Sequence, residues 1–479
     1  MAASAGRKRG LSPSESLERE IKRLEQRIYD DPTLDSMLGV GGKIAFLSGL
    51  IMALLPCQGR PAFTADSLHG GDGADDNDGV LVLSRARSLL DAHGCPKHGA
   101  DAIMGVLGKV FSRRELWAPA DGGSMIASMC RTVETRIMPP ILQGAGGDIS
   151  GMILTVMSGW NPIEGDRLGD VVLTPLPTAH LMARIARVGA ASNVWDPCMG
   201  SAGLLRASAD IMAEDAAEGS PSGTHGGVSG VEILDSVYMS AVLSMIMSGM
   251  DLSRIVYGDS LKEMDSIIGG GWKPDVLIMN PPYSAPGRGL VFAEESLARM
   301  GGGYGAVLIQ ENAGGGRGGD HARRILETST LKASIRMPAD LFAGRAAVQT
   351  AVYLFQAGRP HRIDDSVTFI DFSVDGYSRG SRRKSLQNVN LKDTDHAADR
   401  YREVTDICLG RRPATSYYTE GNGNLIRDTI SLSGDDWMFS QHRRIIPEPT
   451  EEDFMRTVSD YLAWKASAIL KGEIDESSR

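Results

Sequence analysis

The sequence predicts an α/β protein built around a mostly parallel, doubly wound β-sheet. From about residue 190, short runs rich in β-branched and aromatic residues alternate with longer segments of helical periodicity, the pattern of parallel strands joined by helices. Polar and glycine-rich stretches directly follow several of these runs, and such sheets bind ligands beyond the carboxyl ends of their strands. The predicted strands lie in SNVWDP, VSGVE, RIVYGDS, DVLIMNPPY, GAVLIQE, KASIRMP, TAVYLFQ and VTFIDF.

The chain of 479 residues is long enough for two or three domains. We expect residues 1–14 to be disordered, because they are basic and polar, and residues 15–160 to form a helical N-terminal domain. Residues 161–405 are expected to hold the sheet, and residues 406–479 to form a C-terminal region with a partner-docking helix. A doubly wound sheet with a helical domain before it and a helical tail after it is therefore the predicted architecture.

Two amphipathic helices are predicted near the ends of the chain. Leu17, Ile21, Leu24 and Ile28 recur at 4-3-4 spacing, which indicates a helix that either packs on its own domain or makes a short coiled-coil contact. In the tail, Phe454, Val458, Leu462 and Ile469 fall on roughly one helical face. Packing on the parent domain and docking on a partner subunit remain open for that second helix.

Composition and charge narrow the class of protein. A net charge of -10 argues against a generally basic nucleic-acid binder. One local basic cluster is present, and it is either a phosphate contact or a solvated loop: Arg379, Arg382, Arg383 and Lys384. The five cysteines form no C-x-x-C pair, so we expect no disulfide framework, no metal site and a cytoplasmic location. The apolar run Ile44–Leu55 has the length of a core helix, and no membrane association is expected.

The loop after the first predicted strand is DPCMGSAG, which contains Asp196, Gly200, Ser201 and Gly203. A glycine loop entering a helix lets backbone N–H groups face a ligand, but an acid at its start would repel a phosphate. Asp196 suits instead a ligand with a positively charged amino group, such as the methionine part of S-adenosylmethionine. A plain strand-to-helix turn is the alternative for this loop taken alone.

Two further acids follow the next two strands. Glu232 ends the second strand and is suited to accept hydrogen bonds from both hydroxyls of a ribose. Asp259 ends the third and is placed to accept a hydrogen bond from an adenine amino group. Either acid alone would more often be a loop carboxylate that caps a helix, but their order ahead of the fourth strand favours a nucleoside-binding site.

The fourth strand ends in Asn280, Pro281, Pro282 and Tyr283, which read NPPY. The exocyclic amino group of a nucleobase is a poor nucleophile, because its lone pair is delocalised into the ring. The Asn280 side-chain oxygen and the Pro281 carbonyl would accept its two hydrogens, while the prolines hold both acceptors rigidly. Tyr283 can stack on the base, so the motif predicts amino-group methylation by orientation and hydrogen bonding, without a strong base.

These motifs, in this order, resemble those of N6-adenine DNA methyltransferases. The surrounding sequence is most similar to the modification subunit of type I restriction–modification systems, through residues 166–185 and 331–361. The resemblance implies a class I S-adenosylmethionine-dependent methyltransferase fold, S-adenosylmethionine as cofactor and duplex DNA as substrate. It also implies that Thr174 and Pro175 close over the methionine part, and that Phe342 stacks on a flipped adenine. Ala202 departs from the family, which usually has glycine there.

The resemblance also implies partners. Only about 75–110 residues follow the catalytic domain, too few for two target-recognition domains, so a separate specificity subunit and a restriction nuclease subunit are expected. Two copies of this chain are expected for each specificity subunit. Alternatives that stay open are a stand-alone DNA adenine methyltransferase, methylation of an RNA base or a glutamine amide, a combined nuclease–methyltransferase, and a non-catalytic DNA-binding scaffold.

Overall fold

The computed structural model describes residues 12–57, 59–71, 73, 75–119, 123–144, 149–157, 173–217, 226–269, 271–342, 348–379, 391–443 and 451–470. Contacts within the chain group residues 1–441 into one compact unit and residues 442–479 into another. The expected disorder of residues 1–14 falls mostly outside the described residues, since the first of them is Ser12.

Among the described residues, nine strands form one sheet in the order β11-β8-β6-β7-β5-β4-β1-β2-β3. All strand pairs from β3 to β5 are parallel, whereas β7 is antiparallel to both β5 and β6. The prediction of a mostly parallel sheet is confirmed. The strands are β1 (Asn193–Asp196), β2 (Gly227–Glu232), β3 (Ile255–Tyr257), β4 (Val276–Met279), β5 (Tyr304–Gln310), β6 (Ser329–Arg336), β7 (Thr350–Ala357), β8 (Val367–Asp371) and β11 (Leu425–Asp428).

The sheet separates two hydrophobic cores. Because successive side chains of a strand point to opposite faces, Leu277 and Met279 of β4 enter one core while Ile278 enters the other. One face is covered by α9 (Leu176–Ile185), α10 (Gly203–Ala217) and α11 (Asp235–Met247). The second is covered by α12 (Ser260–Gly269), α13 (Leu290–Arg299) and α14 (Gly319–Thr328). A strand that is covered by helices on both faces has a continuous apolar sequence, which is why these strands can be predicted from the sequence.

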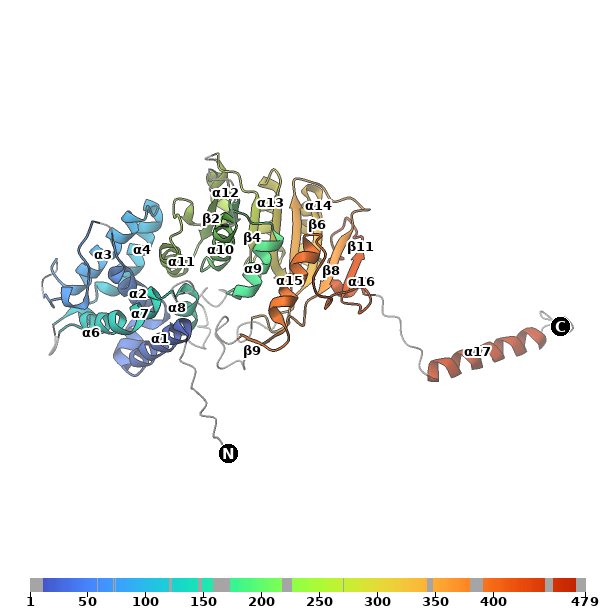
Figure 1. Ribbon diagram of the computed structural model, residues 1–479, viewed down its shortest axis with the longest axis horizontal. Helices are drawn as coiled ribbons and strands as arrows, with labels where there is room; N and C mark the ends of the chain where they lie inside the picture. The colour runs from blue at the N-terminus through green and yellow to red at the C-terminus, as the bar shows by residue number, and fades with distance from the viewer. Residues whose placement is uncertain are drawn as a thin grey trace, which may run out of the picture. The chain divides into compact units, whose positions relative to one another are not determined.

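Helices before the sheet share one of these cores (Figure 1). Leu17, Ile21, Leu24 and Ile28 are all buried there, so the first amphipathic helix packs on its own chain and presents no free coiled-coil face. The helices are α1 (Pro13–Tyr29), α2 (Pro32–Leu54), η1 (Ala65–Ser67), α3 (Asp78–Ala92), α4 (Lys97–Phe111), α5 (Arg114–Trp117), α6 (Met125–Thr132), the π-helical turn η2 (Val133–Ile137), α7 (Met138–Leu142) and α8 (Ile149–Met157).

Helix α2 contains the apolar run at residues 44–55 and is longer than that run. Among the described residues, it is the one helix whose length and mean hydropathy of 1.8 would also suit a membrane span. Of its most apolar window, 67% is buried inside the protein. It packs against α3, α4, α8 and α11, which is the environment of a core helix.

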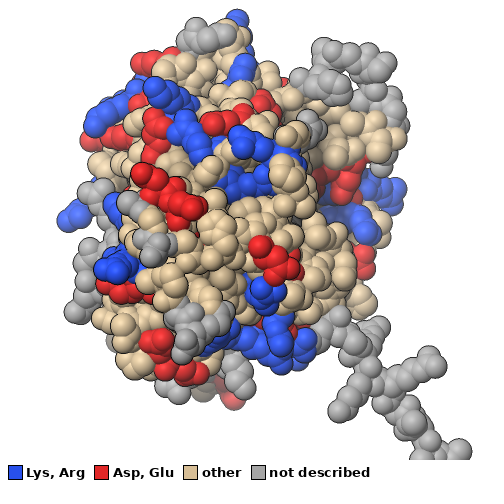
Figure 2. All heavy atoms as spheres, turned by 90° about the vertical axis from the view of Figure 1, so that its left-hand side faces the viewer, with Lys and Arg blue, Asp and Glu red and all other residues tan. Residues whose placement is uncertain are grey.

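Helix α11 joins the N-terminal helices to the sheet. Every residue from Ser236 to Ile246 is buried, because one side of α11 packs on β2 and β3 and the other on α2, α4 and α8. A helix that is apolar all round needs this cover on all sides. On the outer surface of the N-terminal region, basic and acidic side chains are interspersed (Figure 2).

A small hairpin, β9 (Tyr377–Arg379) paired with β10 (Leu391–Asp393), lies outside the main sheet and precedes α15 (Ala397–Cys408). Arg379 is not the solvated or phosphate-facing residue that the sequence suggested. Its side chain is 5% exposed, and it makes an ion pair with Asp375 inside the protein. Arg382, Arg383 and Lys384 of the same basic cluster lie outside the described residues.

The C-terminal unit contains α17 (Glu451–Leu470), which follows the short α16 (Phe439–His442). The apolar residues predicted for one face of the tail helix, Phe454, Val458, Leu462 and Ile469, are all exposed on α17, together with Tyr461 and Trp464. Such a run of exposed apolar side chains is typical of an interaction surface.

Candidate active site

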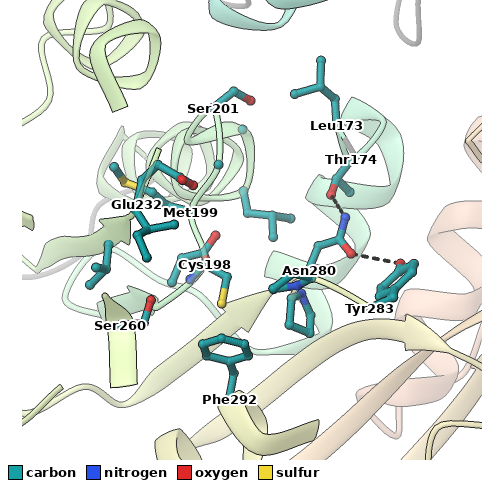
Figure 3. Close-up of a pocket in the computed structure, with 18 of the residues that line it drawn as sticks. Leu173, Thr174, Cys198, Met199, Ser201, Glu232, Ser260, Asn280, Tyr283 and Phe292 are labelled. Carbon is teal, nitrogen blue, oxygen red and sulfur yellow. Dashed lines mark hydrogen bonds between the residues drawn. The ribbon is translucent and has the colours of Figure 1, made fainter. Parts of the chain in front are cut away.

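A pocket of about 620 Å³ lies at the carboxyl ends of β1, β2 and β4, the place where a doubly wound sheet binds its ligands. Residues from several separate parts of the chain converge on it (Figure 3). Of the residues singled out in the sequence, the pocket wall includes Thr174, Asp196, Gly200, Ser201, Gly203, Glu232, Asn280, Pro281, Pro282 and Tyr283.

The loop after β1 turns tightly so that it can enter α10. Gly200 has φ of 53° and Ala202 has φ of 63°, so two residues of this loop are left-handed. Glycine adopts that conformation freely, whereas alanine is strained in it. The position where the family usually has glycine is therefore one where this chain carries backbone strain. The Met199 N–H donates to the Val231 carbonyl at 3.0 Å, which ties the loop to β2.

Asp196 is fully buried at the start of this loop. Its Oδ1 accepts from the Cys198 N–H at 3.0 Å, but among the described residues nothing donates to its Oδ2. Burial raises the pKa of Asp196 to about 8, the Cys198 N–H opposes the rise, and the nearby Glu232 charge adds to it. A buried carboxylate with an unused acceptor is suited to a ligand that brings a cationic donor.

Glu232 lies at the end of β2 and faces the same pocket (Figure 3). Its Oε1 accepts from the Leu234 N–H at 2.7 Å. Burial raises the pKa of Glu232, although hydrogen bonds from the backbone of Leu234, Ile233 and Gly200 oppose that rise. Burial also raises the pKa of the neighbouring Cys198 thiol well above its ordinary value, so Cys198 is a neutral wall residue rather than a nucleophile.

The Asn280 side chain bridges two elements. Its Nδ2 donates to Thr174 Oγ1 at 3.2 Å, and its Oδ1 accepts from the Tyr283 hydroxyl at 3.0 Å (Figure 3). Burial raises the pKa of Tyr283 well above its ordinary value, so the hydroxyl keeps its proton. The amide plane is thus held between the segment that leads into α9 and the ring of its own loop.

The catalytic-loop candidates rest on a compact support. Gly289, at φ of 96°, packs against the ring of Pro281 and the carbonyl of Pro282, where a Cβ would approach within 3.2 Å of both. The Ala285 N–H donates to the Pro282 carbonyl at 3.2 Å. Among the described residues, no N–H or O–H donates to the Pro281 carbonyl, which leaves that oxygen as an acceptor beside Asn280.

Three sequence candidates do not lie on the pocket wall. Pro175 caps the start of α9, one residue beyond Thr174. Asp259 accepts from the Leu261 N–H at 3.2 Å and pairs with Lys262 at 3.3 Å, so it acts as a cap of α12. Phe342 is 1% exposed in the core beneath the sheet face, and the residues that follow it, 343–347, lie outside the described part of the chain.

The structure adds Phe292 and Ser260 to the pocket. Phe292, in the first turn of α13, lines the pocket with Asn280 and Cys198 (Figure 3). It is off the buried stripe of that helix, which runs through Leu290, Ala293 and Leu297. In the sequence, the one feature that could have indicated a role for Phe292 is that this aromatic residue lies outside the apolar stripe of its helix. Ser260, next to Asp259, donates its hydroxyl to the Pro197 carbonyl, which joins the α12 start to the β1 loop.

The pocket combines two chemistries. Its β1–β2 side presents a buried carboxylate, Asp196, and a half-buried one, Glu232, near glycine backbone. Such a side is suited to a cationic, hydroxyl-bearing ligand. Its β4 side presents a rigid amide oxygen and a carbonyl oxygen beside an aromatic ring, suited to an amino group on a flat base. Because the two sides face one cavity, a group can pass from the first ligand to the second within it.

The chain is similar in sequence and in fold to several known proteins. The chain is 24% identical, over 97% of its length and 72% of the relative's, to the type II restriction enzyme and methyltransferase RM.BcgI from Heyndrickxia coagulans. In fold it is similar to a chain from a structure of a type I restriction–modification system, with a TM-score of 0.57, 15% identity and coverage of 97% of this chain and 100% of the other.

A second similar structure is a modification subunit of a putative type I restriction enzyme from Vibrio vulnificus YJ016, with a TM-score of 0.56, 14% identity and coverage of 90% and 96% of the two chains. At these identities the solved structures establish the fold. The family model described as N-6 DNA methylase matches residues 148–299 and 290–411, more than half of the chain and the whole of the pocket described above. The chain therefore belongs to the N-6 DNA methylase family and is an S-adenosylmethionine-dependent DNA methyltransferase.

Proposed function

We propose that this chain methylates the N6 amino group of an adenine flipped out of duplex DNA, as the modification subunit of a type I restriction–modification system. The observation that carries the proposal is the convergence of Asn280 and Tyr283 with Asp196 and Glu232 on one pocket. Similarity in fold to type I chains supports the choice of system.

The acidic side of the pocket fits the cofactor. S-adenosylmethionine supplies a methyl group made electrophilic by the sulfonium that carries it. Asp196, with its unused Oδ2, would bind the amino group of the methionine part, and Glu232 would accept from the ribose hydroxyls. Gly200, Ser201 and Gly203 provide backbone that a ligand can approach closely, and Thr174 would lie over the methionine part.

Asn280 and Pro281 would hold the target amino group. The Asn280 Oδ1 and the Pro281 carbonyl accept its two hydrogens and orient its lone pair towards the methyl group. A carbonyl-type oxygen has two acceptor sites, so Asn280 Oδ1 can keep its bond from Tyr283 while it accepts from the base. The amino group becomes more acidic as it takes the methyl, and its surplus proton then leaves to water.

Tyr283 is the aromatic residue that we assign to stacking on the flipped base. Flipping costs a few kcal/mol, and stacking in the pocket offsets part of that cost. The role expected for Phe342 requires that its ring leave the core position described above, so our proposal does not depend on it.

Partners are part of the proposal. With a net charge of -10 the chain would release few counterions on DNA, so its affinity alone should be low at physiological salt. We propose that a specificity subunit supplies sequence recognition, with two copies of this chain on each, and that a restriction nuclease joins them. The exposed apolar residues of α17 are the docking surface we propose for the specificity subunit.

The test is single-turnover transfer of labelled methyl to unmethylated duplex DNA, by the chain with and without the products of the genes beside its own. Digestion of the DNA to nucleosides should yield labelled N6-methyladenine, and only with the added partner. Labelled RNA or labelled glutamine in a peptide would instead identify one of the rival substrates. Methylation of one defined sequence by the chain alone at nanomolar concentration would contradict the subunit assignment.

A second candidate is a combined restriction enzyme and methyltransferase. The match to RM.BcgI, which extends over 97% of this chain, favours it. DNA cleavage by the purified chain in the presence of Mg²⁺ and S-adenosylmethionine would support that candidate over the type I subunit.

A further inference from the structure

A buried polar cluster outside the pocket is centred on Asp375, in the segment between β8 and β9. Asp375 is 1% exposed, and each of its oxygens has two donors. Oδ1 accepts from the Tyr377 N–H at 3.0 Å and from Arg379 Nη1 at 3.1 Å. Oδ2 accepts from Arg379 Nη2 and from the Tyr401 hydroxyl at 2.9 Å. The carboxylate therefore uses its full acceptor capacity, which is what a buried charge requires.

Tyr401 extends this cluster to helix α9. Its hydroxyl lies 3.5 Å from Thr178 Oγ1, and Thr178 is fully buried. Because the Tyr401 proton points to Asp375, the Thr178 hydroxyl is the donor in that contact. Burial and the Asp375 charge raise the pKa of Tyr401 well above its ordinary value, so the direction of the chain of hydrogen bonds is constant with pH. Consecutive bonds of this kind strengthen one another.

Helix α9 connects this cluster to the active site. Thr178 lies one helical turn beyond Thr174, and the Ala179 N–H donates to the Pro175 carbonyl at 2.9 Å, so the first turn is closed between them. Thr174 accepts from Asn280 Nδ2. Helix α15, which carries Tyr401, packs beside α9 (Figure 1). The start of α9 is therefore hydrogen-bonded at one end to Asn280 and at the other to the Asp375 cluster.

We propose that Arg379, Asp375, Tyr401 and Thr178 form a positioning relay, which sets the place of α9 and so the orientation of the Asn280 amide during methyl transfer. None of these four residues lines the pocket. Their role is to restrict Thr174, and the inference rests on the proposed role of Asn280. The relay should affect the rate of the chemical step more than the affinity for S-adenosylmethionine. Of the cofactor contacts proposed above only Thr174 depends on the relay, whereas Asp196 and Glu232 are held by β1 and β2.

The central test is Tyr401→Phe, which keeps the ring against Phe372 and Tyr377 and removes only the hydroxyl. Loss of one net hydrogen bond from the relay should lower the single-turnover rate about 3- to 10-fold. KM for S-adenosylmethionine should stay within about twofold, and the amide protons of Ala179 and His180 should exchange faster with solvent.

Tyr418→Phe is the matched control. Tyr418 belongs to the same aromatic cluster, and its hydroxyl donates to the Val374 carbonyl at 2.8 Å without touching Thr178. The Tyr418→Phe variant should leave the rate and the exchange of the Ala179 and His180 amides at the wild-type level. If both variants slow the reaction equally, the effect of Tyr401→Phe is one of general packing and the relay is wrong.

Thr178→Val supplies the second arm, since valine has the shape of threonine without its hydroxyl. In a double-mutant cycle, Thr178→Val should add little to Tyr401→Phe, because both break the same chain of bonds. Additive effects, or a wild-type rate for Tyr401→Phe, would overturn the relay. The assay uses the full-length chain with the products of its neighbouring genes, tritiated S-adenosylmethionine and unmethylated plasmid DNA, and includes Asn280→Ala. Equal rates for wild type and Asn280→Ala would instead indicate that the proposed function itself is wrong.

Discussion

Asn280 and Thr174 are 106 residues apart in the chain and are joined by a hydrogen bond of 3.2 Å. The bond connects the carboxyl end of β4 to the segment that opens α9. It leaves the carbonyl oxygen of the amide on the side of Tyr283 and the pocket (Figure 3). The orientation of this one amide therefore depends on two elements that meet only in the folded protein.

Asn280→Ala should abolish most methyl transfer. It removes one of the two acceptors for the amino group, and loss of one preorganised hydrogen-bonding group costs about 10²–10³-fold in rate. Binding of S-adenosylmethionine, measured by calorimetry, should change little. Thr174→Val, which removes only the bond that holds the amide, should slow the reaction much less. Near-normal turnover of Asn280→Ala would disprove the catalytic role.

Glu232→Ala should weaken binding of S-adenosylmethionine by about tenfold or more, because two hydrogen bonds to its carboxyl oxygens are lost. Asp259→Ala should have a much smaller effect, since Asp259 caps α12 and lies off the pocket wall. Calorimetric titration of both variants separates the two acids. Equal losses of affinity would place Asp259 at the cofactor after all.

Cofactor affinity should rise with pH up to about 8. The pKa of Asp196 in the free protein is about 8, and only its ionised form attracts an amino group that carries a positive charge. Below that pH, binding must release the proton, so the affinity should fall by up to about tenfold for each pH unit. Calorimetric titration in two buffers with different ionisation enthalpies measures the number of protons that are released when the cofactor binds.

Asp196→Asn is the control for this pH dependence. It should bind more weakly and lose most of the slope below pH 8. The native state of the wild type also binds more protons than the unfolded chain between about pH 4 and 8, so its stability should decrease across that window. Asp196→Asn should lack that decrease. A wild-type affinity that is flat from pH 6 to 8 would contradict the buried, partly protonated state.

Ala202→Gly should stabilise the protein. Ala202 has φ of 63°, a conformation that costs alanine about 1 kcal/mol relative to glycine. Thermal unfolding should show a rise in Tm, with cofactor affinity unchanged. Ala207→Gly, inside helix α10 that follows this loop, is the matched control and should lower Tm by a similar amount. A drop in Tm for Ala202→Gly would show that the left-handed turn is absent.

The order of elements from β1 to β8 could be predicted because each strand is a continuous apolar run. The antiparallel direction of β7 could not, since Thr350–Ala357 is buried on both faces and a strand of either direction would have the same composition. β11 was missed because Leu425–Asp428 is short and polar at its end, and only its pairing with β8 makes it a strand.

For the site, motif order was enough to bring residues such as Asp196, Glu232 and Asn280 into one pocket. Residues whose position depends on packing are harder to predict from the sequence. The segment around Phe342 resembles the family's, but that likeness does not determine whether the ring faces the pocket or the core. Arg379 looked like a surface cation because it adjoins three basic residues, and only the fold brings Asp375 beside it.

Helix α11 limits how this enzyme can be cut into parts. All its residues from Ser236 to Ile246 are buried, so removal of residues 1–157 would leave open to water the apolar side of α11 that packs on α2, α4 and α8. A fragment that begins at the segment before α9 would carry every pocket residue and still be prone to aggregate. The N-terminal helices are thus required for a folded methyltransferase whether or not they ever touch DNA, and a shortened gene product should be inactive for reasons of solubility alone.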